Sequence, residues 1–219
     1  MSLKEQLEEY RASWFKRVPA ERQAIMQRHI DQLRTGEISR TMLKAGDHAP
    51  AIVLDNAKGE TIDVGEMLKN GPVVVTFYRG GWCPFCNLEL KAFQEILPQI
   101  KAVGASLVAI SPERPDESLS TVEKNALSFE VLSDLKQMAG RSFGLVYEFT
   151  DELKTAYDGF GLDIPTRNGA PGEWSLPVAA TYVIGSNGVI RYAHTDTDYR
   201  DRADPLDVLK ALTQMAEAT

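Results

Sequence analysis

Residues 72–79 constrain the fold most strongly, because P-V-V-V-T-F-Y-R is almost entirely apolar or β-branched. A half-exposed strand alternates apolar and polar residues, so this run predicts a strand buried on both faces. Residues 106–111, S-L-V-A-I-S, have the same character. Between the two runs the apolar residues recur at helix spacing, with Phe93 and Ile100 on one face, and Pro98 should kink or end that helix. Strands alternating with helices predict an α/β fold.

The chain divides into an N-terminal helical extension, residues 1–43, and a main domain, residues 44–219. In the extension Leu3, Leu7 and Tyr10 recur at helix spacing. This stripe predicts packing against the main domain or against a partner subunit, which leaves a homodimer open.

The C-terminal third predicts a loop, a hairpin and a helix. Residues 161–177 are rich in Gly and Pro, which favours a loop. A hairpin follows over residues 179–192 around an Asn-Gly turn. Asp204 is a suitable N-cap for the last helix, with Leu206 and Leu212 expected to face inward.

Charge and hydropathy exclude two kinds of partner. The 219 residues contain 24 Lys and Arg against 31 Asp and Glu, a net charge of −7, which suits neither nucleic acid nor an anionic membrane. No apolar stretch approaches the roughly 18 residues of a membrane span, and the charged first ten residues do not resemble a signal peptide. We therefore expect a cytoplasmic protein.

Cys83 and Cys86 are the two cysteines of the chain. A disulfide across so short a loop constrains the unfolded chain little. In the cytoplasm a Cys-x-x-Cys pair is more often catalytic or metal-binding than structural.

The position of the pair favours thiolate chemistry. The buried strand ends near Arg79, two glycines make the turn, and Pro84 suits the first position of a helix, which places Cys83 at the N-cap and Cys86 on the third helical residue. Backbone N–H groups and the helix dipole at this end lower a thiol pKa. Arg79 adds a full positive charge if its side chain turns toward the pair. The N-cap position suggests Cys83 as the more exposed thiolate.

A zinc site is the main alternative for such a pair, and it needs two further ligands. The imidazoles, His29, His48 and His194, show no ligand spacing. We therefore expect no metal and no cofactor.

Two other features have an ordinary structural interpretation beside a functional one. Trp82 either shapes an apolar mouth for a substrate or partner, or simply packs. The charge-rich residues 195–204, T-D-T-D-Y-R-D-R-A-D, lack the glycine that a calcium loop needs and predict a solvated loop.

The segment F-Y-R-G-G-W-C-P-F-C-N-L-E-L resembles the peroxiredoxin-like branch of the alkyl hydroperoxide reductase/thiol-specific antioxidant family, within the thioredoxin fold. Three other stretches agree: G-D-H-A-P-A-I-V-L from residue 46, V-A-I-S-P-E from residue 108 and L-P-V-A-A-T-Y-V-I from residue 176. The resemblance covers about residues 44–215 and implies a central mixed sheet flanked by helices.

The resemblance also implies roles for the pair. The peroxide-attacking cysteine of peroxiredoxins aligns with Cys86, so Cys83 would be the resolving thiol. This order is opposite to the one that the N-cap position favours. A thioredoxin-type reductant would restore the dithiol, with a peroxide as substrate.

The chain departs from the family pattern at two positions. Arg79 stands where peroxiredoxins carry a proline, and Ala179 stands where they carry an arginine. Thioredoxin-like folds also place a cis-proline at this late strand. By register that position is Ala179, and Pro177 lies two residues earlier.

These features predict a thiol-dependent peroxidase that reduces hydrogen peroxide or organic hydroperoxides. Two alternatives stay open: a thiol-disulfide oxidoreductase acting on protein disulfides, which Trp82 and Pro84 would suit, and a redox sensor without turnover. The candidate supporting residues are Arg79, Trp82, Pro84 and Pro177.

Overall fold

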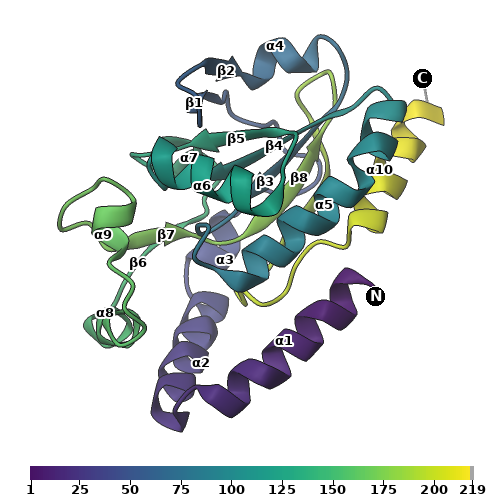
Figure 1. The fold of residues 1–219 in the computed structure, drawn as a ribbon. Coiled ribbons are helices and arrows are strands. Elements are labelled where there is room, and N and C mark those ends of the chain that lie inside the picture. Colours follow the sequence, from purple (N-terminus) through teal and green to yellow (C-terminus); the bar gives the residue numbers. More distant parts are fainter. Residues whose placement is uncertain (218–219) are drawn as a thin grey trace.

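The computed structural model describes residues 1–217 and shows a central mixed sheet flanked by helices (Figure 1). Within these residues one sheet has the strand order β2-β1-β5-β4-β3-β8-β9, and β6 and β7 form a separate two-stranded ladder. The strands are β1 (Val53–Asn56), β2 (Thr61–Asp63), β3 (Val73–Phe77), β4 (Ser106–Ser111), β5 (Glu130–Ser133), β6 (Val146–Glu148), β7 (Ser175–Pro177), β8 (Ala180–Ile184) and β9 (Ile190–Thr195). The helices are α1 (Leu3–Arg17), α2 (Ala20–Thr35), α3 (Ile38–Thr41), α4 (Val64–Leu68), α5 (Pro84–Ala102), α6 (Pro115–Asn125), α7 (Met138–Ser142), α8 (Asp151–Asp158), α9 (Ile164–Arg167) and α10 (Pro205–Glu217).

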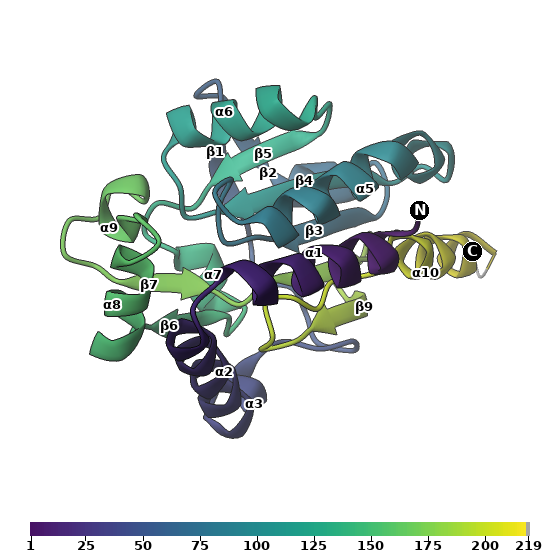
Figure 2. The same cartoon turned by 60° about the horizontal axis from the view of Figure 1, so that its bottom comes forward.

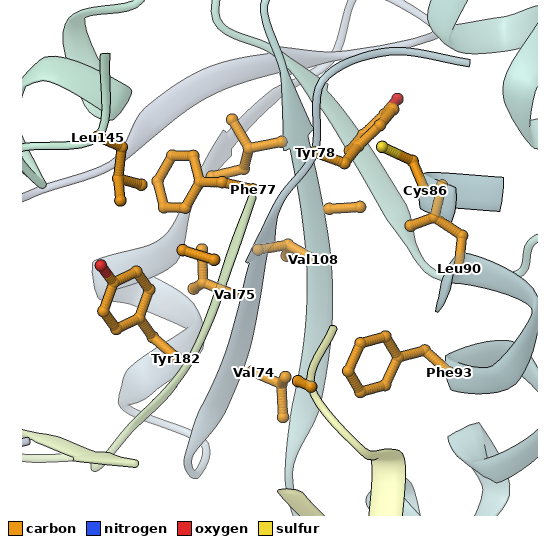
Figure 3. Close-up of a cluster of buried hydrophobic side chains, with 14 of the residues drawn as sticks. Val74, Val75, Phe77, Tyr78, Cys86, Leu90, Phe93, Val108, Leu145 and Tyr182 are labelled. Atoms are coloured by element: carbon orange, nitrogen blue, oxygen red, sulfur yellow. The ribbon is translucent and has the colours of Figure 1, made fainter. Parts of the chain in front are cut away.

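Strand β3 is buried along its whole length, as its composition predicts. It runs parallel to β4 and antiparallel to β8. Figure 3 shows its side chains alternating between two apolar layers: Val75 points toward Tyr182, whereas Val74 points toward Phe93 on α5. Burial on both faces explains why the strand carries no polar alternation.

Helix α5 follows the strand and continues through Pro98 to Ala102. The sequence predicts that Pro98 kinks or ends the helix, and the prediction that it ends the helix is wrong. A proline removes one hydrogen bond to the preceding turn. Pro98 is exposed, and water can solvate the carbonyl group that its ring leaves unbonded.

The segment 161–177 is not simply a loop. Helix α9 forms within it because the Asp163 side chain accepts a hydrogen bond from the Thr166 N–H group at 3.1 Å. Strand β7 forms because it pairs with β6 in antiparallel register. Both elements are very short. The cap of α9 is local, whereas β7 depends on a partner strand that local composition does not reveal.

Helix α10 begins as expected, with the Asp204 side chain accepting a hydrogen bond from the Leu206 N–H group at 2.9 Å. Its inward face differs from the prediction at one position. Leu212 is buried, but Leu206 is exposed and Val208 takes the inward place instead.

The N-terminal helices pack on the main domain. Helix α1 contacts α5, and α2 contacts α8 (Figures 1 and 2). Leu3 and Leu7 are buried on α1, and Arg28 of α2 forms an ion pair with Glu152 of α8. The division of the chain between residues 43 and 44 stays a prediction. None of the helices within residues 1–217 combines the length and the hydropathy that a membrane-spanning helix requires.

His29, on the buried side of α2, allows a test of this packing. Its ring centroid lies 4.8 Å from that of Tyr147, and burial together with the charge of Arg79 lowers the pKa of His29 to about 4. The unfolded chain protonates a histidine near pH 6.5, so the folded state loses stability as the pH falls from 6.5 toward 4. We predict a loss of about 2 kcal/mol between pH 7.5 and 5.0 from this group.

Urea denaturation of the wild type and His29→Phe at both pH values measures this loss. The variant should lack it, because phenylalanine cannot take up the proton. His48→Gln, at an exposed histidine, should behave as the wild type does. Equal pH dependence in the wild type and His29→Phe would refute the prediction.

Candidate active site

The turn between β3 and α5 places both cysteines at the helix N-terminus. Cys83 is the N-cap and Pro84 the first helical residue, as the sequence predicts. Gly80 has φ of 150°, and a Cβ there would lie 2.9 Å from the Glu113 carboxyl carbon, so the tight turn requires glycine. The Glu113 carboxylate anchors the turn by accepting the Gly81 N–H at 2.7 Å.

Two guanidinium groups lie against the two sulfurs. Arg79 Nη1 is 3.7 Å from Cys83 Sγ, so the Arg79 side chain does turn toward the pair. Arg202 Nη2 is 3.2 Å from Cys86 Sγ and 3.9 Å from Cys83 Sγ. Both cysteines are free thiols and are almost fully buried, with exposed fractions of 1% for Cys83 and 0% for Cys86.

These charges separate the acidities of the two thiols. Burial by itself raises the pKa of Cys83, but a hydrogen bond from Cys86 and the charges of Arg79 and Arg202 outweigh it and lower the pKa to about 5. Burial raises the pKa of Cys86, and the hydrogen bond to Cys83 raises it further. The two arginines therefore favour one negative charge on the pair, with the lowered pKa at Cys83 and the raised pKa at Cys86.

Arg202 is the functional group that sequence reasoning missed. The structure contradicts the prediction of a solvated loop over residues 195–204, because Arg202 is buried. Its Nη1 donates to the Glu89 carboxylate at 3.0 Å and its Nε donates to the Tyr199 carbonyl at 2.8 Å. Glu89 in turn accepts a hydrogen bond from Thr181 at 3.3 Å. A buried guanidinium needs such partners, and the local sequence contains no signal for a partner so far along the chain.

Arg79 is held by aromatic rings as well as by charge. Its guanidinium carbon lies 4.1 Å from the ring centroid of Tyr199, 4.9 Å from that of Trp82 and 5.7 Å from that of Tyr157. Cation–π contacts of this kind orient a buried arginine without neutralising it. Arg79 therefore keeps its full charge for Cys83.

A cavity of about 300 Å³ opens over Cys83 and not over Cys86. Trp82, Pro84 and Phe85 line it, so the mouth that the sequence suggested for Trp82 exists. Aromatic and aliphatic side chains form most of its wall.

Pro177 lies outside this arrangement. It belongs to β7, pairs with Val146, and packs near Gly140. Ala179, where the family carries an arginine, is buried beside β8, and residues 1–217 contain no cis peptide bond. Within the same residues no three His, Cys, Asp or Glu side chains are grouped as a metal site would require.

Comparisons with known proteins agree with this geometry. The model of the AhpC/TSA family matches residues 45–193. Peroxiredoxin Bcp of Escherichia coli K12 is 31% identical over 117 residues, which cover 53% of this chain and 74% of that protein. A putative peroxiredoxin bcp of Buchnera aphidicola is 31% identical over 105 residues, 48% of this chain and 66% of its relative.

A solved structure gives the same fold. The crystal structure of peroxidoxin BcpB from Mycobacterium tuberculosis superimposes with a TM-score of 0.63 at 20% identity, covering 79% of this chain and 98% of that one. The match to the family model spans more than half of the chain, including β3, α5 and the cysteine pair. The chain therefore belongs to the AhpC/TSA family, as a peroxiredoxin-like protein of the thioredoxin fold, and this membership places it among the thiol-dependent peroxidases.

Proposed function

We propose that Cys83 and Cys86 carry out a thiol peroxidase cycle in which Cys83 attacks the peroxide and Cys86 resolves the product. The observation that carries this proposal is the position of Cys83: its sulfur borders a cavity, and Arg79 and Arg202 stabilise its anion. A thiolate in reach of a substrate is what peroxide reduction needs.

In the first step the Cys83 thiolate attacks one peroxide oxygen. A sulfur–oxygen bond forms, the oxygen–oxygen bond breaks, and the second oxygen leaves as an alkoxide or hydroxide. The leaving group takes up a proton from water in the cavity, and the Cys86 thiol loses its proton to water in turn, as its thiolate is stabilised by Arg202. The step produces a sulfenic acid on Cys83, an alcohol or water, and a thiolate on Cys86.

In the second step the Cys86 thiolate attacks the Cys83 sulfur. A disulfide forms and the sulfenic hydroxyl leaves, taking up a proton to become water. Arg202 stabilises the Cys86 thiolate between the two steps, from 3.2 Å. A thioredoxin-type dithiol then reduces the disulfide by thiol–disulfide exchange, and we place this cycle in the cytoplasm, where such reductants keep thiols reduced.

This order of attack differs from the one that the family register implies, which assigns peroxide attack to Cys86. Two observations favour Cys83. Its thiol has the lowered pKa, whereas that of Cys86 is raised. It also lines the cavity, whereas Cys86 does not line it and lies in the apolar cluster beside Tyr78 (Figure 3).

A protein-disulfide oxidoreductase is the second candidate, because the intact pair with Pro84 between its cysteines has thioredoxin-like spacing. Burial argues against it. A protein disulfide must approach the attacking sulfur closely, and only 1% of Cys83 is exposed. A small peroxide can enter the cavity without such an approach.

Peroxide consumption tests the proposal. The purified protein is incubated with thioredoxin, thioredoxin reductase, NADPH and either hydrogen peroxide or an organic hydroperoxide, and NADPH oxidation is followed. We expect turnover that requires both cysteines. Insulin reduction without consumption of any peroxide would favour the second candidate instead.

Single cysteine variants establish the order of attack. After one equivalent of peroxide, Cys86→Ser should retain a sulfenic acid on Cys83 that dimedone traps, because its attacking thiolate is intact. Cys83→Ser should react at least ten-fold more slowly. Mass spectrometry of the dimedone adducts identifies the modified cysteine. Fast adduct formation on Cys86 in Cys83→Ser would contradict the proposed order and support attack by Cys86, as the family register implies.

Arg202→Met tests the electrostatic role of the buried arginine. Loss of the positive charge should raise the pKa of Cys83 by one unit or more, because a nearby cation favours the thiolate. The iodoacetamide reaction rate against pH locates this pKa. The midpoint should move to higher pH in Arg202→Met. In Arg202→Lys, which keeps the charge, the midpoint should stay close to the wild-type value.

Arg200→Met is the matched control for this experiment. Arg200 is also buried and lies two residues away, but it pairs with Asp198 at 2.6 Å. Arg200→Met should leave the pH midpoint of Cys83 alkylation unchanged. Circular dichroism must show folded protein for each variant, and an unmoved midpoint in folded Arg202→Met would contradict the assigned role.

A further inference from the structure

The cavity over Cys83 is built only partly by the segment that matches the family. Tyr10, Trp14 and Arg17 of α1 line it, and so does Met26 of α2. All four precede residue 45, where the family match begins. The N-terminal extension therefore contributes a wall of the active site as well as a structural support.

Helix α1 is fixed to this wall by direct packing. The ring centroids of Tyr10 and Phe85 are 5.1 Å apart in an edge-to-face arrangement, and Phe85 is the residue between Pro84 and Cys86. Phe85 also meets Tyr199 at 5.6 Å. Tyr10 therefore contacts a residue of the cysteine motif directly, and the position of its ring affects the shape of the cavity.

The chemistry of the lining selects a class of ligand. Its charged members are Arg17, which is exposed, Arg79, which is buried, and the Cys83 thiolate, and no lining residue is Asp or Glu. The remaining lining residues are apolar or aromatic. A neutral ligand with a hydrocarbon group suits this surface.

The size of the cavity points in the same direction. Its volume is about 300 Å³. A water molecule occupies about 30 Å³ of liquid, and hydrogen peroxide is only slightly larger than water. Hydrogen peroxide would leave most of the apolar wall in contact with water, whereas a bulky organic group would cover it.

We infer that Tyr10 and Trp14 are specificity-determining residues, which give the enzyme a preference for hydroperoxides with an aromatic or branched hydrocarbon group over hydrogen peroxide. This inference rests on the proposed peroxidase function and adds the contribution of α1. The chemical step is unchanged: the Cys83 thiolate takes one oxygen, and the organic product is the alcohol. Only the binding of the leaving group depends on the α1 wall.

Steady-state kinetics with cumene hydroperoxide and hydrogen peroxide test the inference on the full-length chain. The wild type should have the higher kcat/KM for cumene hydroperoxide. Tyr10→Ala and Trp14→Ala should each lower that value by about ten-fold, within the range for lost apolar contacts in a pocket. For hydrogen peroxide the decrease should be less than about three-fold.

Glu9→Ala is the matched control. Glu9 is an exposed residue on the same helix, next to Tyr10 in the sequence, and does not line the cavity. Its loss should leave the ratio of the two kcat/KM values as in the wild type. Tyr10→Phe keeps the ring and should also keep the ratio.

A second readout does not depend on turnover. Cumyl alcohol, the product of cumene hydroperoxide, should slow the alkylation of Cys83 by iodoacetamide in the wild type, and Trp14→Ala should lose this protection. Thermal unfolding identifies any variant that fails to fold, and Tyr10→Leu and Trp14→Leu then replace the alanine variants.

The outcomes separate the two claims. If the wild type consumes both peroxides with equal kcat/KM, or if Tyr10→Ala and Trp14→Ala leave the ratio unchanged, the inference about α1 fails while the peroxidase function stands. If the wild type consumes neither peroxide, the proposed function fails and the inference falls with it.

Discussion

Two buried guanidinium groups beside two buried sulfurs are the interaction on which the rest of this site depends. A charge removed from water is costly unless other charges and hydrogen bonds compensate it. Arg202 meets this requirement by binding the Glu89 carboxylate and the sulfur pair together, so that its one positive charge interacts favourably with both. The buried charge of Arg79 is stabilised by cation–π contacts with the rings of Trp82 and Tyr199. Cys83, the proposed nucleophile, has a lowered pKa inside an apolar region because cations from two distant segments lie beside it.

The fold explains how these segments meet. Strand β3 is fixed at the centre of the sheet by burial on both faces, and its carboxyl end delivers Arg79 and the glycine turn to the N-terminus of α5. Two further walls of the site come from segments near the ends of the sequence. Helix α1 lies along α5 (Figure 2), and the segment before α10 places Tyr199 against Arg79 and Arg202 against the two sulfurs. The family match spans residues 45–193, so both of these walls lie outside it. The cysteine pair lies within the matched residues, whereas both of these walls come from residues on either side of them.

The sequence predicted those parts of the site that depend on local pattern. The all-apolar run identified β3, and Pro84 after Cys83 identified the start of α5, because both signals act within a few residues. Arg202 could not be found in this way, since its charge is compensated by Glu89, 113 residues earlier, and the acidic residues around it give the segment the composition of a solvated loop. Leu206 is a related case: helix spacing predicted an inward leucine, but the packing of α10 places Val208 there instead.

A lowered pKa of Cys83 is the property of the site to measure first. Thiolate absorbance at 240 nm, titrated in the wild type and in Cys83→Ser, isolates the contribution of this residue. We expect a transition in the wild type with a midpoint near pH 5, which Cys83→Ser lacks. A first thiol transition at pH 8.5 or above, the range of an ordinary cysteine, would contradict it.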